Sequence, residues 1–137
     1  MIWATRPHCH VDRTACAWLI RSRIDRDAEF VFVDDVEVVP PGATAFDMPG
    51  VELSHHDGRC SFETMLLHYD LRDPGLHALA RVVHEADVEN DRFHAPEARG
   101  LDAIVRGMGR LYDDLELLER TAPIYDGLYA QLAPTGT

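Results

Sequence analysis

The chain has 137 residues, of which 46% are hydrophobic and 27% are charged, a composition typical of a single globular domain. Its formal net charge of −11 combines 24 acidic residues with 13 basic ones, all of them arginine. Because such a surface repels phosphate groups, we expect no direct nucleic-acid binding by this domain alone. No apolar run approaches the roughly 20 residues of a membrane span, and we see no signal peptide, so we expect a cytoplasmic protein.

The three cysteines, Cys9, Cys16 and Cys60, occur without a C-x-x-C spacing. Their odd number argues against a disulfide framework, and the missing spacing argues against a zinc ribbon. Cys16 falls in an apolar helical pattern, which predicts a small core residue. Cys9 and Cys60 lie beside histidines, so both are candidates for metal binding or reactivity.

The first half of the chain contains short apolar runs that predict strands. Ile2 and Ala4 alternate with their neighbours, whereas residues 30–33 are apolar without interruption, as in a strand with both faces covered. Strands are predicted at residues 1–6, 29–33, 44–47 and 51–54. Between the first two strands, Asp12 is predicted to cap a helix that begins at Arg13 and runs to residue 24.

The second half of the chain has the apolar spacing of helices. Asp73 followed by Pro74 is a typical helix start, and Asp113–Asp114 is predicted to cap the last helix. Pro123 inside that helix predicts a kink or a break. Helices are predicted at residues 62–69, 74–87, 96–111 and 115–130.

This order, with strands first and a run of helices after them, predicts an α+β fold. We expect a small three- to four-stranded sheet from the N-terminal half, covered by about four helices that are mostly C-terminal. The single domain is expected to span residues 1–133. Residues 90–95 are predicted to form a polar loop, and residues 134–137 a disordered tail.

A first group of polar residues lies where the first strand ends and the first helix begins. It consists of Arg6, His8, His10, Asp12 and Arg13. Ligands often bind at the carboxyl ends of strands, and helix N-termini favour anions, so Arg6 and Arg13 could hold an oxyanion there. The alternative is structural, with Asp12 as a helix cap and Arg13 as its ion-pair partner.

A second group lies in residues 54–63, which contain histidines, a cysteine and carboxylates within ten positions. Imidazole, thiolate and carboxylate are the usual protein ligands of transition metals. His55 at a strand end and Glu63 in the first turn of the next helix are the favoured ligands, whereas His56 is expected to be solvated. The alternative is a plain turn in which Cys60 caps the helix.

A third group is His84 and Asp87, which are three residues apart and therefore share a helix face. A histidine and a carboxylate at this spacing can ligate one ion, as in helical di-metal sites. The alternative is that the helix dipole alone favours a histidine near the C-terminus. Together with His55 and Glu63, these two residues are the predicted ligands of a divalent Zn, Mn or Fe ion.

Several stretches of the sequence carry a family resemblance and occur in a fixed order. They are residues 3–6 (WATR), 12–20 (DRTACAWLI), 46–47 (FD), 55–63 (HHDGRCSFE), 73–74 (DP), 82–84 (VVH) and 125–129 (YDGLY). With them the sequence resembles the C-terminal domain of the chromate-resistance protein ChrB, over essentially the whole chain. In that family a helix-turn-helix-like region often precedes the domain, and the whole protein acts as a chromate-responsive regulator of an efflux operon.

The resemblance implies a stand-alone sensor or accessory domain in which the matched polar positions share one site. These positions are Arg6, Asp12, Arg13 and Cys60, assigned to ligand binding, and His55, Glu63, His84 and Asp87, assigned to a metal. One hypothesis is therefore a module that binds chromate or another oxyanion, with or without a metal.

Two further hypotheses belong to other classes of protein. One is a small metal-dependent enzyme, hydrolytic or redox, that keeps a water in an open coordination position. The other is a scaffold or dimerisation domain, for which a homodimer is possible and in which the polar residues are structural. Convergence of Arg6, His55 and His84 on one pocket would favour a ligand site over a scaffold.

Overall fold

The computed structural model of the chain describes residues 1–88 and 92–134. Residues 90 and 91 of the predicted polar loop and residues 135–137 of the predicted tail lie outside this part. In the described residues no helix is both long enough and apolar enough to cross a membrane.

The apolar runs of the N-terminal half form a parallel three-stranded sheet. β1 (Ile2–Thr5) is the central strand, with β2 (Glu29–Phe32) on one side and β3 (Thr44–Ala45) on the other. Trp3 lies opposite Phe30 in β2. Parallel pairing places the carboxyl ends of all three strands at the same edge of the sheet.

Two predictions about the strands are wrong in detail. Residues 51–54 do not form a fourth strand, because Leu53 makes only an isolated bridge to Phe46 while the Ser54 hydroxyl donates to the nearby Val51 carbonyl and closes a local turn. In β2, Val31 is half-buried rather than covered, because β2 is an edge strand.

The predicted helices are confirmed with shifted ends. They are α1 (Val11–Leu19), α2 (Ser61–His68), α3 (Pro74–Val88), α4 (Glu97–Gly109) and α5 (Asp114–Leu132), together with a π-helical turn η1 (Ile20–Ile24) that extends α1 and a 3-10 turn η2 (Val36–Val38). His10, not Asp12, is the N-cap of α1, so the predicted cap is wrong. α5 continues through Pro123 without a break.

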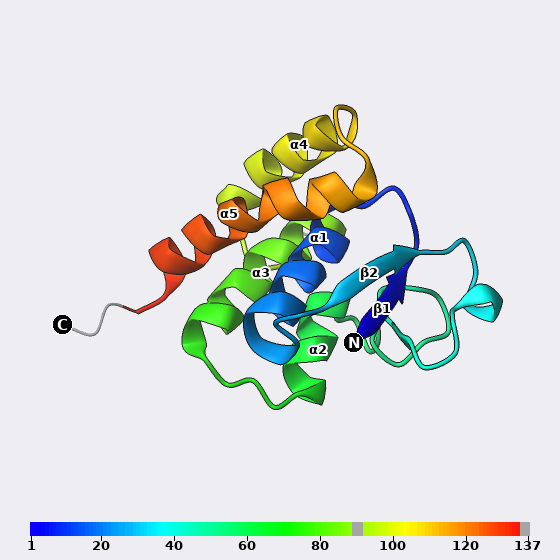
Figure 1. Cartoon of the computed structure of the whole chain (residues 1–137). Coiled ribbons are helices and arrows are strands. Elements are labelled where there is room, and N and C mark those ends of the chain that lie inside the picture. Colours follow the sequence, from blue (N-terminus) through cyan, green and yellow to red (C-terminus); the bar gives the residue numbers. More distant parts are fainter. Residues whose placement is uncertain (89–91, 135–137) are drawn as a thin grey trace.

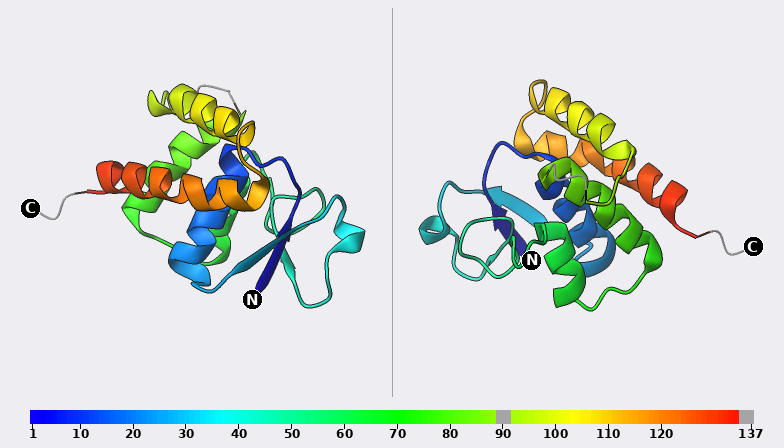
Figure 2. Two further views of the ribbon diagram at one scale, coloured as in Figure 1. Left: turned by 45° about the horizontal axis from the view of Figure 1, so that its top comes forward. Right: turned by 180° about the vertical axis from the view of Figure 1, so that it is seen from behind.

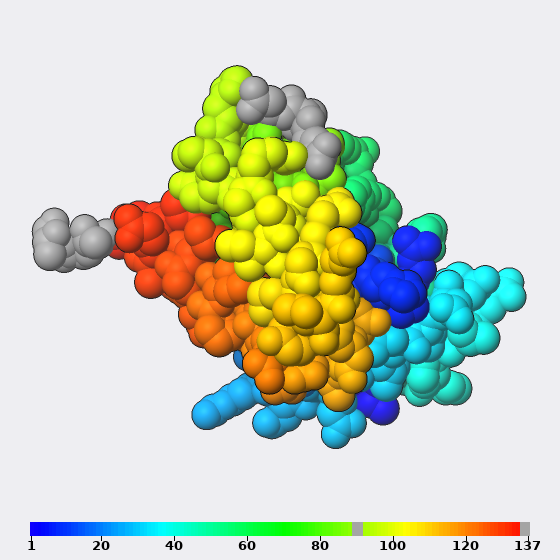
Figure 3. Space-filling view, turned by 90° about the horizontal axis from the view of Figure 1, so that it is seen from above, coloured from blue at the N-terminus to red at the C-terminus, as the bar shows by residue number. Residues whose placement is uncertain are grey.

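The helices gather on one side of the sheet, and the loops that flank β3 between β2 and α2 extend away from the helices (Figures 1 and 2). α1 is central, because it contacts each of the other four α-helices. Seen from above, α4 and α5 cover one face of the molecule (Figure 3). The α+β class predicted from the order of elements is therefore confirmed.

Large aromatic side chains join the sheet to the helices in the core. Trp3 and Phe46 are buried and pack edge-to-face, with ring centroids 6.4 Å apart. Tyr125 of α5 is fully buried, and its hydroxyl lies 2.6 Å from Thr14 Oγ1 and donates to the Val11 carbonyl at 3.1 Å. These contacts fix the start of α1 against α5, and they hold in place the edge of the sheet where the polar residues meet.

Candidate metal and oxyanion site

Asp12 lies in the first turn of α1, but its carboxylate caps a different helix. Oδ2 accepts the backbone N–H of Ser61 at 2.8 Å, and Oδ1 accepts that of Phe62 at 2.9 Å. These two amides belong to the first turn of α2, where backbone donors have no partner within the helix. Burial alone would raise the pKa of Asp12, but the hydrogen bonds from His55, Phe62 and Ser61 outweigh it and lower the pKa below its ordinary value.

His55 lies between two carboxylates. Its Nε2 atom is 3.1 Å from Asp12 Oδ2 and 3.1 Å from Asp87 Oδ2, at the end of α3. A neutral imidazole offers at most one proton at this nitrogen, so two carboxylates compete for it. Their hydrogen bonds raise the pKa of His55 to about 10. Because the His55 side chain is 52% exposed and that of Asp87 is 23% exposed, this group is open to ligands from solvent.

Asp47 adds a third carboxylate, which is not among the site residues predicted from the sequence. Its Oδ1 atom lies 3.9 Å from His55 Nε2 and accepts the Ser61 hydroxyl at 2.6 Å. Burial, followed by the charge of Asp12, raises the pKa of Asp47 to about 7, against the opposing effect of Arg13. One sequence signal could have found it: Asp47 is the last residue of a predicted strand, as Arg6 is, and parallel strands end at one edge.

Arg13 ties the loop after β1 to the loop that carries Asp47. Its Nε donates to Asp47 Oδ2 at 3.0 Å, and its terminal nitrogens donate to the carbonyls of Arg6, Pro7 and Asp47 at 3.0–3.1 Å. These four bonds use four of the five guanidinium N–H groups. Arg13 therefore positions the site and has little capacity left to bind an anion. Its ion-pair partner is Asp47, not Asp12 as in the structural alternative.

These residues border one open pocket of about 410 Å³. Its lining brings together four of the predicted site residues, which are Arg6, Arg13, His55 and Asp87. The Arg6 side chain is exposed and makes no hydrogen bond or ion pair with residues 1–88 or 92–134, so its charge is available at the rim. His56 is exposed as predicted, and it also lines the pocket.

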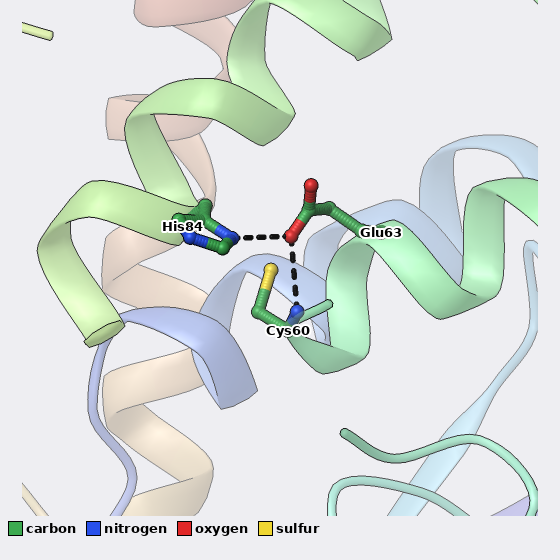
Figure 4. A group of neighbouring side chains, drawn as sticks. All are labelled: Cys60, Glu63 and His84. Atoms are coloured by element: carbon green, nitrogen blue, oxygen red, sulfur yellow. Dashed lines mark hydrogen bonds and ion pairs between the residues drawn. The ribbon is translucent and has the colours of Figure 1, made fainter. Parts of the chain in front are cut away.

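The remaining predicted residues form a second, buried group. Glu63 Oε1 accepts from His84 Nδ1 at 2.6 Å and from the backbone N–H of Cys60 at 3.0 Å (Figure 4). His84 and Cys60 are fully buried. Burial raises the pKa of the Cys60 thiol well above its ordinary value, so without a bound metal it is a neutral thiol.

The four predicted metal ligands therefore do not surround one point. His55 and Asp87 line the open pocket and group with the buried Asp12, whereas Glu63 and His84 lie with Cys60. The two groups flank the first turn of α2, because Asp12 binds the Ser61 amide on one side and Glu63 binds the Cys60 amide on the other. Within each group the candidate ligand atoms lie within 4.8 Å of one another.

Cys9 has a structural environment instead. The side chain is buried, its Sγ lies 3.9 Å from the Arg6 carbonyl, and its backbone N–H donates to Asp114 Oδ1 at 2.9 Å. His8 donates its backbone N–H to Asp114 as well. Cys9 and His8 are thus held by the start of α5, and neither lines the open pocket.

Comparison with known proteins places the chain in a family. Residues 3–132 match the family model described as ChrB, C-terminal domain. Over 133 residues the chain is 40% identical to Protein ChrB of Cupriavidus metallidurans (strain CH34), an alignment that covers 96% of this chain and 40% of that protein. The chain thus spans about two-fifths of the length of this curated relative. No solved structure matches it. With nearly its whole length matched, the chain belongs to the family of ChrB C-terminal domains.

Proposed function

We propose that this protein is a chromate-resistance-related sensor or accessory domain that binds a divalent transition metal and, beside it, an oxyanion. The observation that carries the proposal is the position of His55 Nε2, 3.1 Å from both Asp12 and Asp87 in the pocket lined by Arg6. The relative named Protein ChrB and the family resemblance support a role in the response to chromate.

The spacing and chemistry of the three ligands support a metal. Two ligands that each lie about 2.0–2.1 Å from a tetrahedral ion are about 3.3 Å apart, close to the 3.1 Å observed on both sides of His55. One imidazole and two carboxylates suit Zn, Mn or Fe better than a soft metal. Asp12 already accepts two backbone N–H bonds, which hold it in place as ligand-supporting hydrogen bonds do.

The charges around the pocket favour binding of the oxyanion after the metal. The three carboxylates of Asp12, Asp47 and Asp87 outnumber the two cations beside them, Arg13 and the protonated His55, so the group as a whole opposes an anion. A bound divalent cation would displace the proton from His55 into solvent, balance the charges of Asp12 and Asp87, and leave a coordination position open towards the pocket. The free guanidinium of Arg6 then adds a charged donor for the oxyanion at the rim.

The experiment is metal analysis of protein purified without an affinity tag, followed by calorimetric titration with chromate and with sulfate. We expect about one bound metal per chain that depends on the Asp12–His55–Asp87 group, and heat with the oxyanion only when that metal is bound. His55→Ala and Asp87→Asn should abolish this metal and the heat with the oxyanion. Absence of heat with Zn²⁺, Mn²⁺, Fe²⁺, chromate and sulfate would end the proposal.

Exposed residues of the same types provide matched controls. His68 forms a surface ion pair with Glu52, and Asp70 forms one with Arg72. His68→Ala and Asp70→Asn remove the same groups as the two site variants and should leave metal content unchanged. If these controls lost metal as strongly as His55→Ala, the assignment of the site would be wrong.

A second candidate function is a small metal-dependent enzyme, hydrolytic or redox. The observation that favours it is the open side of the Asp12–His55–Asp87 group, since three protein ligands and one open position are typical of catalytic metal sites. Turnover by the metal-loaded protein, lost in His55→Ala, would support this function. Stoichiometric binding of chromate without turnover would favour the sensor.

A further inference from the structure

We propose that Cys60, Glu63 and His84 form a second metal site, of a softer ligand chemistry that suits Zn²⁺. This site is independent of the proposed function, because it shares no ligand with the Asp12–His55–Asp87 group. Cys60 precedes the first turn of α2, Glu63 lies within that turn, and His84 lies near the end of α3. Their side chains point towards a common space between the two helices (Figure 4).

The three ligand atoms are close to the geometry that a tetrahedral ion requires. Cys60 Sγ, a Glu63 carboxylate oxygen and a His84 ring nitrogen lie within 4.8 Å of one another. Binding has to widen the Glu63–His84 separation from 2.6 Å to about 3.3 Å, the distance between two ligands of one tetrahedral zinc. Glu63 can make this shift, because its side chain is 19% exposed whereas His84 is enclosed.

The group is reached from the Glu63 side. Glu63 lines a pocket of about 160 Å³ together with Arg59, Arg81, His77 and Phe93, whereas Cys60 and His84 are buried and do not line it. The Phe93 ring also packs edge-on against His84, with centroids 5.0 Å apart, and covers the imidazole. A cation can therefore enter along Glu63, while the thiolate and the imidazole stay shielded from bulk water.

The charge of the ligand set matches a divalent ion. Cys60 as thiolate and Glu63 as carboxylate contribute two negative charges, and His84 contributes a neutral nitrogen. A divalent ion then makes the group electrically neutral, which is the condition for stable burial of charges. Binding releases the thiol proton, and it also displaces the proton shared by Glu63 and His84.

A purely structural role explains only part of the group. The Glu63–His84 pair and the bond from Glu63 to the Cys60 amide account for those two side chains. Cys60 is the buried N-cap of α2 and forms its capping box with Glu63, as in the alternative given by the sequence. Helix N-caps favour serine, threonine, aspartate and asparagine, so capping does not by itself require a thiol at residue 60. A sulfur beside a histidine and a carboxylate is explained by metal coordination.

The experiment is a Co²⁺ titration monitored by absorption, in which a thiolate ligand produces a sulfur-to-cobalt charge-transfer band. We expect the wild type to bind two equivalents and to show the band with one of them. Cys60→Ser should remove the band and one equivalent, whereas Cys9→Ser, at a buried cysteine of neither group, should keep both. His55→Ala should lose the other equivalent and retain the band.

A second variant protects the test against a folding defect. Glu63→Gln keeps the size of the side chain and should weaken the thiolate-bound equivalent by at least about tenfold, with an unchanged circular dichroism spectrum. Proton release, measured by calorimetry in buffers of different ionisation enthalpy, should fall in Cys60→Ser. A wild type without the band, or a band that persists in Cys60→Ser, would overturn this proposal, and neither result would affect the site at His55.

Discussion

The Asp12 carboxylate accepts the backbone N–H of Ser61 at 2.8 Å, so a side chain of α1 closes the N-terminus of α2, 49 residues further along the chain. The oxygen that accepts this bond, Asp12 Oδ2, also lies 3.1 Å from His55 Nε2. One buried group thereby joins the packing of two helices to the open pocket. Because α2 also carries Glu63, both candidate metal sites are built on the turn that Asp12 holds.

Asp12→Ala should destabilise the fold by about 2–4 kcal/mol in the presence of a chelator. Loss of a cap costs roughly 1 kcal/mol, and each further buried amide without a partner costs about 1–3 kcal/mol. Denaturant unfolding measures the change. Asp113→Ala is the matched control, because Asp113 caps α5 at an exposed position. This substitution should lower the free energy of unfolding by about 1 kcal/mol. Equal losses in the two variants would contradict the buried role of Asp12.

Gly75→Ala should destabilise the contact between α3 and α5. A Cβ atom at Gly75 would lie 2.7 Å from the Tyr129 ring and 2.9 Å from Ala133 Cβ, so neighbouring atoms must move. We expect a loss of about 1–3 kcal/mol in the free energy of unfolding. Gly100→Ala is the control in α4, because a Cβ atom at Gly100 would meet nothing within 4 Å. This substitution should raise the free energy of unfolding by about 0.5–1 kcal/mol. Stabilisation by both changes would refute the close approach at Gly75.

Local sequence patterns predicted the five α-helices and three of the four expected strands. Apolar spacing located α2 and α3 to within a residue or two at each end, because each helix buries one continuous stripe. The predicted strand at residues 51–54 failed because a short apolar run has the same pattern whether or not a partner strand is available. Whether such a run forms a strand depends on the segment that lies beside it. In the described residues, Leu53 forms a bridge only to Phe46.

The arrangement of the site depended on contacts that no local pattern contains. Asp12 looked like a cap for α1, since a carboxylate before a helix is typical of one, but its partners lie in α2. His84 and Asp87 share a face of α3 as predicted, yet one is enclosed and the other reaches His55. Arg6 and His55 line the same pocket. The roles of the predicted site residues as ligands stay predictions.

Stability at acid pH should depend on Asp114. Burial acts to raise the pKa of this carboxyl, but the backbone hydrogen bonds from Cys9 and His8 outweigh it and lower the pKa. A lowered pKa means that the stabilisation is fully present above the unfolded value of about 3.9 and is lost as pH falls through the folded value. The advantage of wild type over Asp114→Asn should therefore shrink below about pH 4.

Free energies of unfolding measured from pH 6 to pH 2 test this dependence. Asp70→Asn serves as the control, because Asp70 is exposed and pairs with Arg72 on the surface. Its difference from wild type should stay small at every pH. A stability difference for Asp114→Asn that is constant down to pH 2 would show that the two backbone bonds do not depend on the charge.

Arg6 and Arg13 should have opposite phenotypes although both line the pocket. Arg6→Ala should leave stability and metal content unchanged and weaken oxyanion binding roughly tenfold or more, since a charged hydrogen bond contributes about 1.5–3 kcal/mol and 1.4 kcal/mol is tenfold. Arg13→Ala should lower the free energy of unfolding, because it removes the bonds that join Asp47 to the loop after β1. Calorimetric titration of the metal-loaded proteins and denaturant unfolding separate the two effects. If Arg6→Ala bound chromate as wild type does, the oxyanion would have to be held by the metal alone.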